Sequence, residues 1–122
     1  MGDTDVNVTL PYPPSSNRYW RTDRGGRPHL SDEAKAYKLD VLLFAVAAGL
    51  RPLEGPVRLT LTIFRPRRAG DLSNRIKILE DALNGIAWGD DKQIVELHAY
   101  RKEDKTNPRA EVTIEQYLEE TA

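Results

Sequence analysis

The chain has 122 residues, of which 39% are hydrophobic and 30% are charged, and its formal net charge is −1. A chain of this length buries roughly two-thirds of its unfolded surface, which is enough for one hydrophobic core. The absence of cysteine excludes disulfides and thiolate metal sites. The longest apolar run, 41–48, is too short to span a bilayer, and the N-terminus lacks the pattern of a signal peptide. We expect a single domain over residues 1–122.

The first elements predicted in chain order are a strand and a long loop. Residues 4–10 are rich in β-branched side chains and alternate loosely, which favours a strand. The proline-rich segment 11–14 ends it, because proline cannot donate a ladder hydrogen bond. Residues 11–30 then form a long polar loop that contains a turn at Gly25-Gly26. A loop of this length in so small a chain is usually functional.

A helix is predicted from Ser31, as its N-cap, to about Ala48, with Gly49 as its stop. Its second half, 39–48, is apolar almost all round except for Asp40. This is more apolar surface than one core-facing stripe needs. We therefore predict that two copies associate, with this helix or a neighbouring strand edge at the contact.

The remaining pattern predicts a strand at 57–64, a basic loop at 65–70, a helix from Asp71 to about 84, and strands at 93–102 and 111–117. The last two strands resemble a hairpin. The order is β-α-β-α-β-β, which indicates an α+β fold with a mixed sheet and helices on one face.

Positive charge is concentrated in two segments, although the whole chain is nearly neutral. Residues 18–28 carry four arginines against one acid, and residues 65–77 carry four arginines and one lysine against one acid. Clustered basic charge is the pattern expected when the partner is a polyphosphate. The alternative is that these arginines are only solvated.

Acidic residues flank the second helix and suggest a metal site. Asp71 opens the helix, Lys77 follows within two turns, and Asp90-Asp91 lie in the turn after it. Carboxylates suit Mg²⁺, which activates water and polarises a phosphodiester. Lys77 is a candidate for stabilising transition-state charge, and three arginines are candidates for anchoring flanking phosphates. They are Arg67, Arg68 and Arg75.

Each candidate also has a simpler explanation. Asp71 is a good helix N-cap, and Lys77 with Asp81 has the spacing of an exposed ion pair. Asp90-Asp91 after a glycine is a common turn sequence. On this alternative the chain is an interaction domain without a metal site.

Three motif blocks resemble the RusA family of Holliday junction resolvases. They are PYPPSSNRYW at 11–20, GDLSNRIK with DALNG at 70–85, and WGDDKQI at 88–94. The resemblance implies a homodimer, often encoded by phages or prophages, that acts in the bacterial cytoplasm. It implies symmetric cleavage of four-way DNA junctions with Mg²⁺ or Mn²⁺, in recombination and repair.

The resemblance also implies roles for individual residues. Asp71 and Asp91 match the family's metal-binding aspartates, with Asp90 beside Asp91, and Lys77 matches its lysine. The expected DNA-binding residues are Asn17, Arg18, Arg21, Arg67, Arg68 and Arg75. One position departs from the pattern, because Ser73 stands where the family has a second aspartate. A hydroxyl is the weaker ligand, which leaves a catalytically weakened junction-binding protein as the alternative.

Overall fold

A computed structural model describes residues 5–15, 19–67 and 72–118. The elements in chain order are strands β1 (Val6–Pro11), β2 (Trp20–Thr22) and β3 (Pro28–Leu30), helix α2 (Asp32–Ala47), strand β4 (Val57–Arg65), helix α3 (Leu72–Leu83), the 3₁₀ turn η2 (Asp91–Gln93), and strands β5 (Ile94–Glu103) and β6 (Arg109–Gln116). The predicted α+β class and order of major elements are confirmed.

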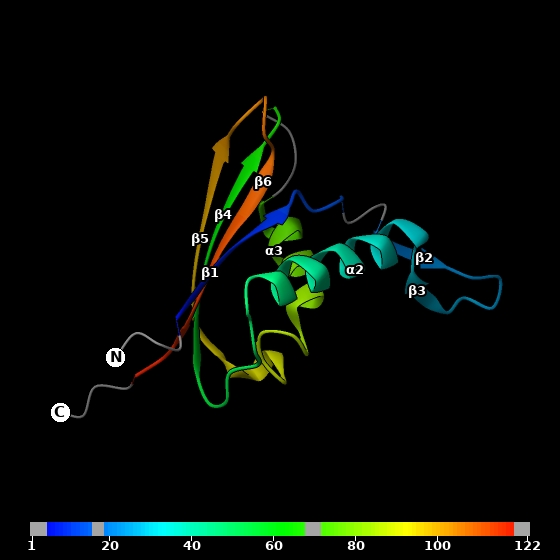
Figure 1. The fold of residues 1–122 in the computed structure, drawn as a ribbon. Helices are drawn as coiled ribbons and strands as arrows, with labels where there is room; N and C mark the ends of the chain where they lie inside the picture. The colour runs from blue at the N-terminus through cyan, green and yellow to red at the C-terminus, as the bar shows by residue number, and fades with distance from the viewer. Residues whose placement is uncertain (1–4, 16–18, 68–71, 119–122) are drawn as a thin grey trace.

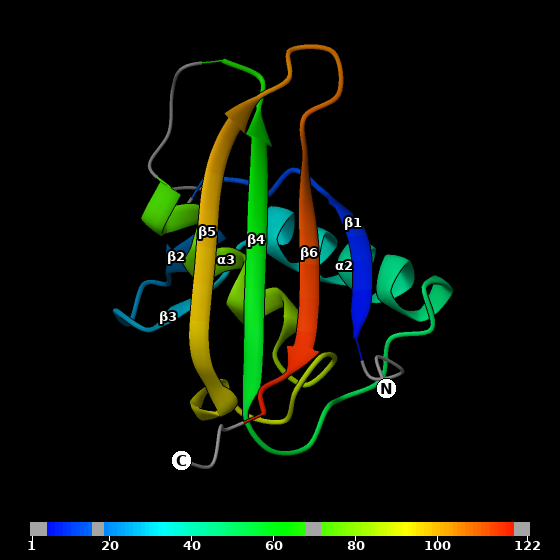
Figure 2. The same ribbon diagram turned by 90° about the vertical axis from the view of Figure 1, so that its left-hand side faces the viewer.

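Four strands form one mixed sheet in the order β1-β6-β4-β5. The β4-β5 pair is parallel, whereas β6 runs antiparallel to both β4 and β1. A parallel pair needs a crossover, and α3 supplies it between β4 and β5. Figure 2 shows the sheet face-on, with α2 and α3 together behind it. The predicted placement of the helices on one face is therefore correct.

The predicted hairpin of the last two strands is wrong. Strand β4 lies between β5 and β6, and the connection at 104–108 passes over its end. The physical reason is the burial of β4, whose alternate residues from Val57 to Ile63 are at most 2% exposed. A buried central strand has two edges to pair, and each neighbour takes one of them.

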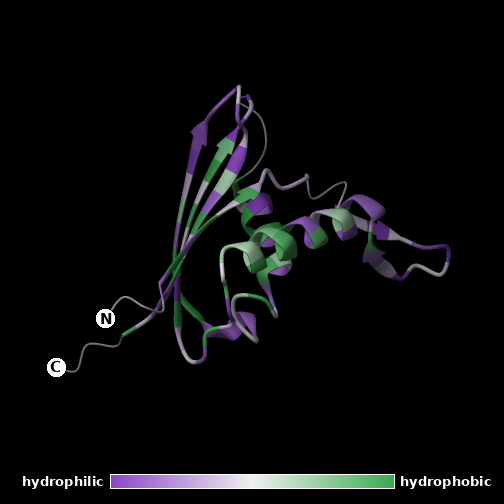
Figure 3. Ribbon diagram, viewed as in Figure 1, coloured by the Kyte–Doolittle hydropathy of each residue, from purple (hydrophilic) through white to green (hydrophobic). Residues whose placement is uncertain are grey.

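The prediction of an unstructured loop at 11–30 is also wrong in its second half. Strands β2 and β3 form a short antiparallel hairpin. Asp23 closes its turn by accepting hydrogen bonds from the backbone N–H groups of Gly25 and Arg27, both at 2.9 Å. Figure 1 shows this hairpin projecting beyond the end of α2, away from the sheet, and Figure 3 shows it as mostly hydrophilic.

Helix α2 has two apolar sides. Ser31 is its N-cap, as predicted, and accepts a hydrogen bond from the Ala34 N–H at 3.0 Å. One side packs into the core through Ala34, Tyr37, Val41 and Ala45. The opposite side carries a second stripe at 40–65% exposure, formed by Leu39, Leu42, Leu43 and Val46. The excess apolar surface predicted for this helix is therefore present. In the part of the chain that is described, no helix is long and apolar enough to cross a membrane.

Candidate active site

The turn before β5 is rigidly anchored. Asp90 caps η2 by accepting a hydrogen bond from the Lys92 N–H at 2.9 Å, and Gln93 completes a capping box with it. The Gln93 amide nitrogen also donates to the carbonyl oxygens of Leu53 and Gly55, at 2.8 and 2.9 Å. Part of the simpler explanation is therefore right, because Asp90 has a structural role as a cap.

Asp91 is held by the largest buried side chain of the core. The indole nitrogen of Trp88 donates to Asp91 Oδ1 at 2.8 Å, and Trp88 is completely buried while Asp91 is exposed. A donor buried this deeply needs an acceptor, so the hydrogen bond fixes the carboxylate. The result is an oriented carboxylate at the surface, which is the arrangement that a metal ligand requires.

Glu80 on α3 was not predicted as a functional residue, yet it lies in the electrostatic field of Asp91. Burial raises the pKa of Glu80, and the negative charge of Asp91 raises that pKa further. Lys77 lies one helical turn before Glu80, so the two positions share a side of α3. This spacing was the available sequence signal. Two carboxylates that disfavour each other's charge suit a divalent cation.

Lys77 is exposed on α3 and Asp81 is not its ion-pair partner. Asp81 instead lies 3.7 Å from Lys38 Nζ and accepts a 2.6 Å hydrogen bond from the Tyr19 hydroxyl. Burial and the neighbouring Asp81 raise the pKa of Tyr19, so its hydroxyl stays protonated as a donor. The ion pair that would have explained Lys77 as a surface residue is thus replaced by a link from Asp81 to α2.

The two groups of predicted ligands lie at opposite ends of α3. Asp71 itself is outside the described residues, but it directly precedes Leu72, the first residue of the helix. Leu72 and Glu80 are separated by eight residues, or about 12 Å along the helix axis. Asp91 lies beyond that end, next to Ile94, which pairs with the first residue of β4. Within one chain, the turn does not return Asp90 and Asp91 to the beginning of α3 (Figure 2).

No group of three or more acidic or histidine side chains among the described residues is arranged to hold a metal ion. The chemistry of the available donors is nevertheless right for a hard cation, because Asp90, Asp91 and Glu80 all offer carboxylate oxygens. A complete ligand set needs a further carboxylate, from Asp71 or from another molecule. Ser73 lies in the first turn of α3, at the same end as Leu72.

The predicted DNA-binding residues fall in three places. Arg21 is exposed on β2, and Arg67 is exposed just after β4. Arg75 is half-buried on α3, where it donates to the Pro13 carbonyl oxygen at 2.9 Å and lies 5.0 Å from the centre of the Tyr12 ring. Three further candidates lie outside the described residues: Asn17, Arg18 and Arg68.

Comparison with known proteins agrees with the motifs. Residues 11–115 match the family model described as endodeoxyribonuclease RusA. The chain is 39% identical over 111 residues to the crossover junction endodeoxyribonuclease RusA of Escherichia coli (strain K12) and to that of Shigella sonnei (strain Ss046), and 38% identical to that of Enterobacteria phage 82. Each alignment covers 88% of this chain and 92% of the relative. The chain therefore belongs to the RusA family of endodeoxyribonucleases.

Proposed function

We propose that this protein is a Mg²⁺-dependent endodeoxyribonuclease that cleaves four-way DNA junctions in recombination and repair. It would act in the cytoplasm of a bacterial or phage-infected cell. The observation that carries the proposal is Asp91, an exposed carboxylate fixed by buried Trp88 in a chain that matches the family model almost end to end. The match supplies the reaction class, and the hydrogen bond supplies an oriented ligand at the position expected for one.

Asp71 and Asp91 would hold the ion, with Asp90 as an auxiliary ligand because it already caps η2. Mg²⁺ is the expected ion, and Mn²⁺ is an acceptable substitute. The bound ion polarises the phosphodiester and lowers the pKa of a coordinated water. Glu80 adds negative charge beside Asp91, and Lys77 provides the positive charge that stabilises the phosphate in the transition state.

Because α3 separates Asp71 from Asp91, we propose that the site is shared by two copies of the chain. Strand β5 is an edge of the sheet and exposes Val95, Leu97 and Tyr100. If two β5 edges met antiparallel about a two-fold axis, the η2 end of one copy would approach the α3-start end of the other. A homodimer of this kind has two equivalent sites, as symmetric cleavage of a junction requires.

The basic residues would bind the phosphates of the junction arms. Arg21 lies on the projecting hairpin and Arg67 follows β4, so the two arginines reach different parts of a branched substrate. Phosphate contacts position DNA without reading its sequence. They also make the affinity depend steeply on salt, because each contact releases counterions.

The second candidate function is junction binding without efficient cleavage. Ser73 is the observation that favours it, because this position lacks the carboxylate of the family pattern. A four-way junction assay separates the possibilities. Cleavage with Mg²⁺ that is lost in EDTA supports the enzyme, and binding without cleavage supports the alternative. A chain that binds junctions no better than linear duplex would have neither function.

A further inference from the structure

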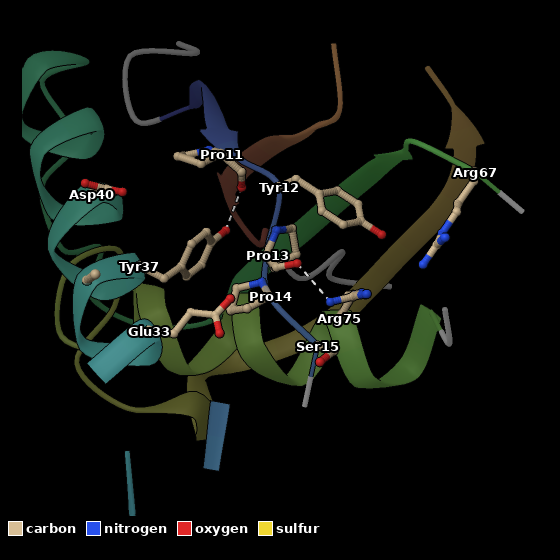
Figure 4. A pocket seen from close by; sticks show the side chains of 11 residues that line it. Pro11, Tyr12, Pro13, Pro14, Ser15, Glu33, Tyr37, Asp40, Arg67 and Arg75 are labelled. Atoms are coloured by element: carbon tan, nitrogen blue, oxygen red, sulfur yellow. Dashed lines mark hydrogen bonds between the residues drawn. The ribbon is translucent and has the colours of Figure 1, made fainter. Parts of the chain in front are cut away.

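A cavity of about 580 Å³ lies beside the proline-rich segment, at the end of the sheet where β1 and β4 finish (Figure 4). Segment 11–15 and side chains of α2 form part of its wall, and Arg67 and Arg75 form another part. Its volume lies in the range of small-molecule sites. The proposed cleavage site uses none of its aromatic lining.

Tyr12 is the aromatic side chain at the centre of this wall, and its backbone is clamped on both sides. The Tyr37 hydroxyl donates to the Pro11 carbonyl oxygen at 2.8 Å, and Arg75 donates to the Pro13 carbonyl oxygen at 2.9 Å. Proline at 11, 13 and 14 further restricts the chain. The ring is therefore held in place before any ligand arrives, which lowers the entropic cost of binding.

Flat surfaces and positive charge meet at this ring. The Arg75 guanidinium stacks over Tyr12 at 5.0 Å from the ring centre, and Arg67 points into the same cavity (Figure 4). Unstacked nucleobases pack on aromatic rings and on guanidinium planes, while arginine binds the adjoining phosphate. Glu33 and Asp40 line the cavity from α2 and repel phosphate, so a nucleotide would place its phosphate towards the arginines.

We propose that this cavity binds one unstacked nucleotide of the junction, with its base packed on the Tyr12–Arg75 pair and its phosphate at Arg67. The proposal rests on the proposed function, because the nucleotide comes from the branch point of the same substrate. Extruding a base is least costly where its pairing or stacking is already interrupted, as at a branch point. The cavity would thereby set the position of the branch relative to the cleavage site.

The test uses the intact wild-type protein in EDTA and four-way junctions that lack the base at one symmetric pair of branch-point positions. Fluorescence anisotropy gives the dissociation constants. Removing the base at the captured position should weaken binding about tenfold, the effect expected for one lost base–aromatic stack. Equal affinity for the intact junction and for every such abasic junction would overturn the proposal.

Variants then assign the effect to the cavity. Tyr12→Leu should bind the intact junction about tenfold more weakly, yet lose nothing further when that base is removed, while Tyr12→Phe should behave like wild type. Arg24→Gln, in the hairpin turn and outside the cavity, is the control for one lost charge, and it should weaken both substrates equally. Equal weakening by Tyr12→Leu would contradict base stacking. If Tyr12→Leu does not fold, the wild-type comparison still decides. Loss of the preference of wild type for junction over duplex would refute the proposed function instead.

Discussion

Replacing Asp91 with asparagine or alanine separates its structural role from its proposed metal-binding role. Asparagine keeps an oxygen that can accept the Trp88 indole hydrogen bond of 2.8 Å, whereas alanine removes the acceptor. Trp88 is completely buried, so alanine leaves its N–H without a partner, at a cost of about 1–3 kcal/mol. For a chain of this size, 1 kcal/mol corresponds to roughly 3–6 °C in Tm. Asp91→Ala should therefore melt several degrees below wild type.

Asp91→Asn should behave differently in the same melting experiment. It removes a negative charge from the surroundings of Glu80, whose pKa is raised by burial and by Asp91. The Tm should therefore hold or rise slightly. Both variants should lose Mg²⁺-dependent cleavage by a factor of at least about 100, since each lacks the ligand charge. Junction binding in EDTA should persist or tighten, because repulsion of phosphate is reduced.

Calorimetry or circular dichroism gives the two melting temperatures, and a gel assay with labelled junctions gives the cleavage rates. If Asp91→Ala melted like wild type, the hydrogen bond to Trp88 would not anchor this turn. If Asp91→Asn cleaved junctions normally, Asp91 would not be a metal ligand, and the assignment of the site would be wrong whatever the melting temperatures.

Three further substitutions test neighbouring parts of the structure. Glu80→Gln should raise the Tm of the metal-free protein at neutral pH, because it removes a half-buried charge near Asp91; an unchanged or lower Tm would contradict that repulsion. Ser73→Asp should tighten Mg²⁺ binding, measured by titration calorimetry, and speed cleavage, and no change in either would remove position 73 from the site. Arg67→Ala should reduce the slope of log K against log salt by about 0.9 for one lost phosphate contact, whereas an unchanged slope would mean that Arg67 does not touch DNA.

The elements with a strong local signal were predictable from the sequence. Helix α2 begins after the Ser31 cap and ends before Gly49, whose φ is +77°, as cap and stop residues indicate. Strand β4 alternates strictly and was placed to within one residue at its end. The small hairpin was missed because its strands have three residues each, although the Gly25-Gly26 turn signal was visible.

Non-local relations were not predictable in the same way. Nothing in β5 or β6 alone says that β4 lies between them, because pairing is decided by which edges the whole sheet leaves open. The site shows the same limit. The motifs identify Asp91 and Lys77, but only the length and direction of α3 show that the ligands at its two ends are separated within one chain. Glu80 was missed because its importance comes from burial and from its proximity to Asp91.

The most direct test of the shared, metal-dependent site mixes two inactive variants, Asp71→Asn and Asp91→Asn. The two proteins are given different affinity tags, expressed together, and purified through both tags so that only mixed dimers remain. If each site takes Asp71 from one copy and Asp91 from the other, a mixed dimer has one site with both carboxylates and one with neither. It should nick one strand of each junction in Mg²⁺ at about half the wild-type rate per dimer, while either variant alone stays inactive. Mixed dimers as inactive as their parents would contradict the shared site.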